Sequence, residues 1–387
     1  MAAGSQQIAM GETCLWPWDY RGIAPRFGRQ MVKEGVIMYV AIDLTGDMIS
    51  YAYPEGNEVT TEVLRNTVGF RTKDLFRVEG AMNGMIRMVK DMIELTVGAT
   101  VSEAICVVPA YCTFPERERI RKAGEECGLT IRRMIKGSFG SAMQLFQSTD
   151  LGTKQALLCD VHSDYTEFLI FNADGAVFEA KGAAVLQYDK NPQDQDKLRE
   201  KLKSEVKTLY SGLGLSMAAN CDAIYVTFDE NTDALRGFFL ETLITYFGKE
   251  PVIFENDTAK GAFYHLLKLE SAETVPMKKC FPVDCCIEGI SIGSGVGGDL
   301  KEVFLRNTPL PAQKTVDLTI SYDNVVCFYA GNYRNREYDE PIGTCRIPDQ
   351  YRSQTIHVKI TLTEDAMVEY VVLDASKQII YPRRKLS

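Results

Sequence analysis

The spacing of apolar residues changes near residue 270, and this change divides the chain into two differently built parts. Before it, apolar runs such as 36–42 alternate with segments such as 77–97, whose apolar residues follow helical spacing. After it, helical spacing disappears, and apolar and polar residues alternate in short runs between turns. The first pattern predicts a layered α/β fold and the second predicts a β-sandwich. With 387 residues, 45% of them hydrophobic, the chain can fill two cores.

The first part reads as a series of strands and helices. A strand over 36–42 runs into a polar turn at Asp43. Thr113, with Glu116 three residues later, forms a capping box, which predicts a helix that starts there and ends at Gly128. The remaining predicted strands cover 101–109, 129–135, 156–159, 168–171 and 223–226, and the remaining predicted helices cover 77–97, 194–214, 234–247 and 258–269.

Composition sets the domain boundaries. Residues 1–35 contain both tryptophans, Trp16 and Trp18, and follow neither helical nor strand spacing, so an irregular segment is predicted. It is an interaction peptide, a disordered tail, or a translated leader ahead of a native start at Met38. We expect an α/β domain over 36–270, a linker over 271–282, a β-sandwich over 283–376 and a basic tail over 377–387.

Charge and cysteine usage exclude several classes of protein. The net charge of −9 leaves no basic excess to neutralise a nucleic-acid backbone. The 11 cysteines form no CxxC pair and several lie in apolar runs, which is typical of small buried side chains in a reducing compartment. No apolar run reaches the roughly 18 to 20 residues of a spanning helix, and the 3 histidines lack metal-ligand spacing. We therefore expect a cytoplasmic protein with no nucleic-acid partner, membrane span or metal site.

Several motifs resemble the Hsp70 chaperone family. The stretch 108–146, which begins Val-Pro-Ala-Tyr, resembles the segment that crosses between the two halves of the Hsp70 ATPase domain. Residues 223–226, 246–251 and 260–262 resemble the segment on its adenosine side. Residues 293–298, 305–311 and 322–324 resemble the start of the family's peptide-binding sandwich. The likeness extends from residue 39 to about residue 375.

This resemblance implies a two-lobed, actin-like (ribonuclease H-like) ATPase fold followed by a peptide-binding type of β-sandwich. The spacing from Asp43 to Val108, like that from Asp160 to Ala223, is much shorter than in the family, so a truncated member that lacks most outer subdomains is expected. The residues that the resemblance assigns to a nucleotide site are Asp43, Thr45, Gly46, Asp160 and Thr227. Those that it assigns to the surroundings of a peptide channel are Val296, Leu318 and Ser321.

The residues that would act on ATP depart from the family's pattern. Gly137 stands where the family has the glutamate that helps to orient the attacking water, a role that glycine cannot play. The turn after Asp160 contains no glycine, although a Cβ obstructs the approach of backbone N–H groups to a phosphate. Asp47 adds a negative charge to the first turn, and Phe228 would crowd the purine. We therefore assign no catalytic residue and expect no turnover of ATP.

Three functions follow from these patterns. The first is an Hsp70-like protein that binds a peptide or a partner protein without hydrolysing ATP, and that needs no cofactor. The second is an ATP-binding chaperone with weak ATPase activity, in which Asp43 and Asp160 contact Mg²⁺ through water. The third is an actin-like structural module that assembles with itself or with cell-envelope machinery. No sequence feature indicates an oligomeric state.

Overall fold

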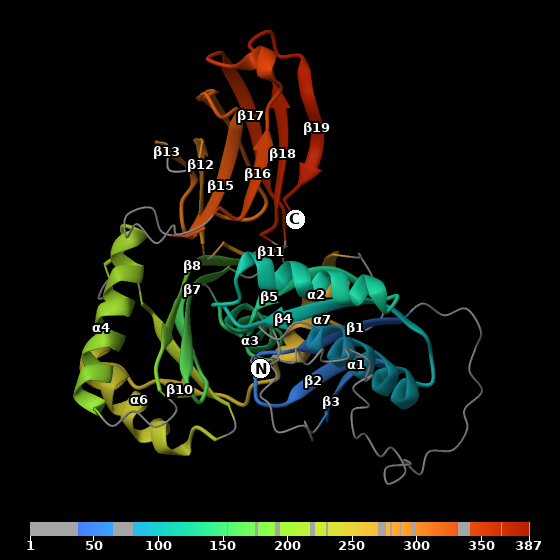
Figure 1. Cartoon of the computed structure of the whole chain (residues 1–387). Helices are drawn as coiled ribbons and strands as arrows, with labels where there is room; N and C mark the ends of the chain where they lie inside the picture. The colour runs from blue at the N-terminus through green and yellow to red at the C-terminus, as the bar shows by residue number, and fades with distance from the viewer. Residues whose placement is uncertain are drawn as a thin grey trace, which may run out of the picture.

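The structure is a computed structural model of the chain. It describes residues 38–64, 80–152, 154–174, 177–189, 194–216, 221–229, 231–269, 276–278, 281–286, 288–295, 299–331, 341–364 and 366–386. The predictions for residues 1–35 and for Val296 lie outside these ranges. Two of the sheets have helices packed against them, and the other two are antiparallel and share one core (Figure 1). A mixed α/β architecture with several sheets is thus confirmed. No helix in the described ranges is long and apolar enough to cross a membrane.

The first lobe is built on a five-stranded sheet of order β3-β2-β1-β4-β5. Its strands are β1 (Met38–Asp43), β2 (Ile49–Glu55), β3 (Glu58–Leu64), β4 (Val101–Val108) and β5 (Thr130–Lys136). Strands β1, β4 and β5 run parallel, and helices α1 (Ala81–Val97) and α2 (Phe114–Glu126) share a core with them. The predicted capping box is confirmed, since Thr113 and Glu116 bond reciprocally at the start of α2.

The second lobe is built on a six-stranded sheet of order β10-β9-β6-β7-β8-β11. Its strands are β6 (Lys154–Val161), β7 (Tyr165–Asp174), β8 (Val177–Gln187), β9 (Ala223–Phe228), β10 (Val252–Ile253) and β11 (Phe281–Val283). Helices α4 (Gln195–Gly212) and α6 (Asp233–Phe247) share a core with this sheet. Helices α3 (Gly137–Ser148) and α7 (Thr258–Leu269) pack together between the lobes, where Ile105 of the first lobe and Leu158 of the second belong to one hydrophobic core.

The C-terminal sandwich consists of two four-stranded sheets, ordered β13-β12-β15-β16 and β14-β17-β18-β19. Its strands are β12 (Gly289–Ser294), β13 (Leu300–Phe304), β14 (Ala312–Thr319), β15 (Val325–Gly331), β16 (Gly343–Arg346), β17 (Thr355–Leu362), β18 (Val368–Leu373) and β19 (Ile379–Lys385). The predicted alternation along β17 is confirmed, since Ile356, Val358 and Ile360 are buried between more exposed neighbours. Among the described residues of 300–370, helical structure is limited to η4 (Asp349–Tyr351).

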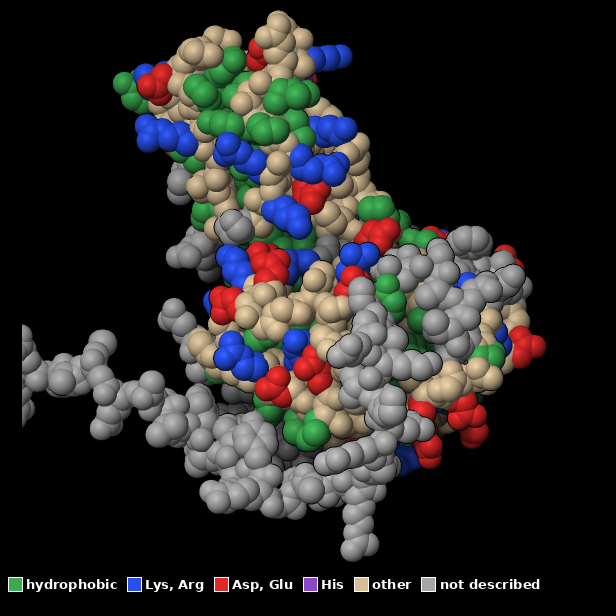
Figure 2. All heavy atoms as spheres, turned by 90° about the vertical axis from the view of Figure 1, so that its right-hand side faces the viewer, with side chains coloured by type: hydrophobic (Ala, Val, Ile, Leu, Met, Phe, Trp, Pro, Cys, Tyr) green, Lys and Arg blue, Asp and Glu red, His purple; other side chains and the backbone are tan. Residues whose placement is uncertain are grey.

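Several segments differ from the sequence-based predictions, among them helix α3, which was not predicted. The predicted tail 377–387 contains β19, an edge strand paired with β18, and an edge is where Pro382 is tolerated. It brings Arg383, Arg384 and Lys385 to the surface, and Lys and Arg side chains spread over this side of the sandwich (Figure 2). The predicted linker ends in β11, which pairs with β8. Strand β8 was not predicted, because alanine and glycine at 180–184 carry little strand propensity.

Candidate functional site

The turn that follows β1 lies against the second lobe. The Asp43 carboxylate ends β1 and accepts hydrogen bonds from the backbone N–H of Thr45 (2.9 Å) and from its hydroxyl (2.7 Å). A Cβ on Gly46 would lie 3.2 Å from the Oδ2 atom of Asp229, which follows β9. Glycine therefore permits the close approach of the two lobes at this point.

The turn between β6 and β7 places the side chain of His162 at the same junction between the lobes. His162 is 4% exposed, and its Nε2 lies 3.4 Å from Asp160 Oδ1. Its Nδ1 lies 3.2 Å from Asp229 Oδ2. The imidazole stacks on the ring of Tyr165, with centroids 4.2 Å apart and planes 6° apart. An ion that approached Asp160 from this turn would meet an imidazole.

Tyr165 joins the two lobes directly. Its hydroxyl donates a hydrogen bond to the backbone carbonyl of Thr45 (3.0 Å), and the ring of Tyr111 packs edge-on against it at 5.0 Å. The Tyr165 side chain is fully buried. We call the group at this junction the interlobe cluster, and its members are Asp43, Thr45, Asp160, His162, Tyr165, Glu167 and Asp229.

Glu167 is the member that sequence reasoning missed. It lies on β7, is 0% exposed, and accepts hydrogen bonds from the backbone N–H of Ala110 (2.6 Å) and of Ser138 (2.8 Å). A Cβ on Gly137 would lie 3.5 Å from one of its carboxylate oxygens. A carboxylate is thus present beside Gly137, although it comes from another strand. The available signal was a glutamate in the apolar run 165–171, because a buried carboxylate needs partners.

Burial and mutual repulsion set the charges in the cluster. Burial raises the pKa of Asp43 to about 7, against the opposing effect of the bonds from Thr45. Burial, together with the charge of Asp160, raises the pKa of Glu167. Burial lowers the pKa of His162, but Asp160 and Asp229 outweigh it, so this pKa lies well above its ordinary value. The two carboxylates thus favour the protonated form of the buried His162 imidazole.

The structure brings the five residues of the predicted nucleotide site to one region. Asp43, Thr45 and Gly46 form the first-lobe turn, and Asp160 lies opposite Thr227 in the parallel register of β6 and β9. The Thr227 hydroxyl is buried and has no hydrogen-bond partner among the described residues. The described part of the chain brings together no group of three His, Cys, Asp or Glu side chains that could hold a metal ion.

The residues predicted near a peptide channel lie in the C-terminal sandwich. Leu318 is 3% exposed and belongs to the sandwich core, so its side chain faces inward. Ser321 is half-buried, and its backbone N–H donates to Ser294 Oγ (2.6 Å). The neighbouring Tyr322 is 82% exposed, with the guanidinium of Arg352 4.6 Å from its ring centre. In this region Tyr322 is therefore accessible to a partner, whereas Leu318 is not.

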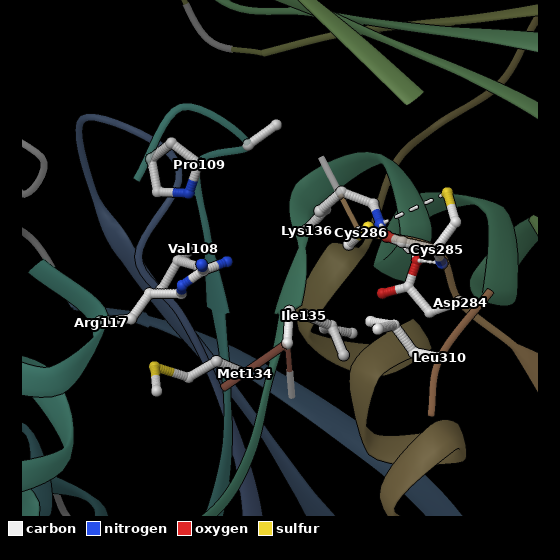
Figure 3. Close-up of a pocket in the computed structure, with 12 residues that line it drawn as sticks. Val108, Pro109, Arg117, Met134, Ile135, Lys136, Asp284, Cys285, Cys286 and Leu310 are labelled. Carbon is white, nitrogen blue, oxygen red and sulfur yellow. Dashed lines mark hydrogen bonds and ion pairs between the residues drawn. The ribbon is translucent and has the colours of Figure 1, made fainter. Parts of the chain in front are cut away.

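A second polar cluster joins the lobes to the sandwich around a cavity of about 20 Å³ (Figure 3). Lys136, at the end of β5, is 6% exposed and donates hydrogen bonds to the Asp284 carboxylate and to the Cys285 carbonyl. Figure 3 shows its amine directed at these two residues. Because Asp284 follows β11 directly, this contact ties the entry of the sandwich to the first lobe.

Further contacts hold the sandwich against both lobes. Arg117 of α2 lies 3.6 Å from Glu288, and Arg306 lies 3.7 Å from Glu205 of α4. The side-chain carbonyl of Asn307 accepts a hydrogen bond from the backbone N–H of Ala183 in β8 (2.8 Å). These contacts involve one residue of α2, one of α4 and one of β8, so the sandwich touches the first and the second lobe.

No protein-family model matches the chain. Over 153 residues, 40% of the chain, it is 28% identical to the chaperone protein DnaK of Deinococcus radiodurans. Over 89 residues, 22% of the chain, it is 29% identical to the heat shock 70-related protein 4 of Leishmania major. Over 97 residues, 25% of the chain, it is 28% identical to the heat shock protein hsp-6 of Caenorhabditis elegans.

These matches cover part of each protein. The aligned stretch is 20% of the Deinococcus protein, 39% of the Leishmania protein and 15% of the Caenorhabditis protein. The predicted relationship is confirmed at that level: parts of the chain are similar to Hsp70-type heat shock proteins and chaperones.

Proposed function

We propose that this protein binds a peptide or a partner protein, as an Hsp70-like chaperone or scaffold, without hydrolysing ATP. In this proposal the two lobes are a trimmed actin-like fold that lacks most outer subdomains, and the C-terminal sandwich is of the peptide-binding type. The partial similarity to heat shock proteins supports the protein-binding role. The proposed location is the cytoplasm.

The observation that carries the proposal is the buried interlobe cluster. A nucleotide between the lobes would have to displace the stacked rings of His162 and Tyr165 and break the bond from Tyr165 to Thr45. Its phosphates would also meet the carboxylates of Asp160 and Asp229. One such pair of like charges at about 4 Å costs roughly 1 to 4 kcal/mol at dielectric constants between those of water and a protein surface.

One observation favours a weak ATPase, with ATP and Mg²⁺ as cofactors, as the second candidate. Glu167 places a carboxylate beside Gly137. A Cβ added at Gly137 would lie 3.5 Å from the Oε1 atom of Glu167. A carboxylate can position water. However, both oxygens of Glu167 already accept backbone N–H bonds, from Ala110 and Ser138. For this reason we place non-hydrolytic binding first.

A thermal-shift titration with Mg-ATP separates the two candidates. A specific ligand at 100 times its dissociation constant adds about 2.7 kcal/mol to the free energy of unfolding, so a bound nucleotide would raise the melting temperature by about 5 to 10 °C. We expect no saturable shift and no phosphate release, either for the wild type or for Gly137→Glu. Phosphate release that Asp160→Asn abolishes would contradict the proposal and support the ATPase.

The binding half of the proposal is tested with a fluorescently labelled apolar peptide. We expect saturable binding that Tyr322→Ala weakens by about tenfold, because exposed aromatic residues are frequent binding hot spots. Ile379→Ala is the matched control, since Ile379 is 66% exposed but lies on β19. Equal loss in both variants, or no binding by the wild type, would contradict this half. Light scattering that grows with protein concentration would instead indicate an assembling module.

A further inference from the structure

His162 is a buried side chain whose contacts come from several elements. Asp160 lies at the end of β6, Asp229 follows β9, and Tyr165 begins β7. The two ring nitrogens lie 3.4 Å from Asp160 and 3.2 Å from Asp229, and one ring face lies against Tyr165. Nδ1 therefore forms a hydrogen bond with Asp229, whereas Nε2 faces Asp160 at ion-pair distance without hydrogen-bond geometry, and one ring face lies against Tyr165.

The same group of residues forms the contact between the lobes. Tyr165 donates its hydroxyl proton to the Thr45 carbonyl across the junction. Asp229 lies so close to Gly46 that an added Cβ would be 3.2 Å from its carboxylate. Both residues also touch His162. A change in His162 must therefore act on two of the side chains through which the second lobe meets the first-lobe turn.

The carboxyl groups around His162 give its side chain a second, electrostatic role in the interlobe cluster. Four carboxyl groups gather here, those of Asp43, Asp160, Glu167 and Asp229, and His162 is the cation whose charge acts on both Asp43 and Glu167. Carboxyl groups in such surroundings repel one another unless a cation lies among them. In many proteins a bound ion supplies that charge. Here a side chain of the chain itself lies between Asp160 and Asp229.

The turn that carries His162 is held in place by Tyr188. The Tyr188 hydroxyl lies 2.7 Å from the His162 carbonyl and 2.9 Å from the Tyr165 carbonyl. The backbone N–H of Tyr188 donates to the carbonyl of Asp164 (2.8 Å), in the middle of the turn. The turn is thus bonded along its length to the end of β8, so His162 is positioned before any ligand arrives.

We propose that His162 is a built-in cation that takes the place of a bound ligand between the lobes, and that its removal leaves a site for a free cation of imidazolium size. The proposal rests on the proposed function in one respect, because both require that the interlobe space be filled by the chain's own side chains. It adds that this filling depends on charge as well as on volume.

Chemical rescue of His162→Ala tests the proposal. Breaking a buried charge pair is expected to lower the melting temperature by about 6 to 20 °C. Imidazole, largely protonated at about pH 6, should restore at least half of the shift in a saturable way. Pyrazole, which has the same shape but stays uncharged, should restore little. Equal rescue by both compounds, or by neither, overturns the role of charge.

His265→Ala is the matched control. His265 is also fully buried, but both its ring nitrogens lack partners among the described residues, and it packs against Phe139 at 5.3 Å. Burial, and then the nearby charge of Arg133, lowers the pKa of His265 well below its ordinary value, so it is neutral. Imidazole and pyrazole should therefore act alike on this variant. Preferential rescue of His265→Ala by imidazole would show that the effect is not specific to the interlobe cluster.

His162→Met keeps the proposal testable if the alanine variant does not fold. Methionine fills a similar volume without charge, so a melting temperature equal to or above that of the wild type would overturn the proposal. The outcome is distinct from that of the proposed function, because Mg-ATP binding is measured separately on the wild type. If imidazole does not rescue the variant and the wild type does not bind ATP, the role of His162 as a cation is rejected and the proposed function stands. ATP binding by the wild type rejects the filled interlobe space.

Discussion

At the scale of single residues, Asp43 shows how burial changes the chemistry of a carboxyl group. The Asp43 residue is half-buried, and its carboxylate accepts two hydrogen bonds from Thr45. Those bonds favour the charged form, yet burial has the larger effect and raises its pKa from 3.8 to about 7. The lesson is that hydrogen bonds to a carboxylate do not by themselves lower its pKa when the group has also left water.

Asp43 makes stability dependent on pH. A carboxyl group whose pKa is raised in the folded state binds more protons when folded, so its contribution is present below the unfolded value and is lost as pH rises through the folded value. We expect the free energy of unfolding to fall between about pH 4 and about pH 7, and to fall less in Asp43→Asn. Urea titrations across this range provide the measurement.

Two other members of the cluster, Glu167 and His162, act in the same direction. The pKa of His162 is also raised, so its stabilising contribution is lost at still higher pH. For this reason the comparison between wild type and Asp43→Asn is made at each pH and not at one pH alone. If the two proteins show the same pH profile, the raised pKa of Asp43 is wrong.

At the scale of elements, the crossing of α3 and α7 depends on a backbone contact. A Cβ on Gly261 of α7 would lie 1.9 Å from the carbonyl oxygen of Gly140 and 2.8 Å from the backbone nitrogen of Gln144. Both are backbone atoms of α3, so neither can move away as a side chain can. The two helices pack between the lobes at this distance because glycine occupies the crossing.

Gly261→Ala should therefore destabilise the protein by about 3 kcal/mol or more, since overpacking here displaces a helix. Chemical denaturation provides the measurement. Gly237→Ala is the control, because Gly237 lies in α6 and nothing within 4 Å would meet its Cβ. That change should stabilise the protein by about 0.5 to 1 kcal/mol through helix propensity. A neutral effect of Gly261→Ala would mean that α3 and α7 do not cross so closely.

At the scale of the whole molecule, the sandwich is attached to the lobes by a buried ion pair and by peripheral ones. Lys136 and its partner Asp284 are both buried, at 6% and 3% exposure. Arg133 and Glu364 lie 3.6 Å apart, and here the arginine side chain is 4% exposed but the glutamate side chain is 54% exposed, so the carboxylate keeps its contact with water. A buried pair is costly to break on one side, whereas exposed pairs contribute little.

Lys136→Met should consequently cost about 3 to 5 kcal/mol, because it leaves the Asp284 carboxylate buried without its cation. Glu364→Gln should cost under about 1 kcal/mol. The double variant Lys136→Met, Asp284→Asn should regain part of the loss, which a double-mutant cycle measures. Strictly additive effects of the two changes would show that Lys136 and Asp284 do not act as a pair in solution.

Much of the secondary structure followed from local patterns. The helix at Thr258–Leu269 was predicted with its observed bounds, and the start of α2 followed from Thr113 and Glu116, because periodicity and capping act over a few residues. The similarity to Hsp70-type proteins was likewise readable from short motifs. Where local signals are weak, as in β8 and β19, only pairing with a neighbouring strand revealed the element.

From the sequence alone came most helices of the first part, the change to an all-β part near residue 270, and the loss of glycine after Asp160, since each depends on neighbouring residues alone. The tertiary structure decided which side chains meet. Glu167 contacts Ala110 across 57 positions, and Lys136 contacts Asp284 across 148. Such contacts depend on how sheets and lobes pack, and no local pattern carries that information, so the position of His162 between Asp160 and Asp229 appeared only once the chain was folded.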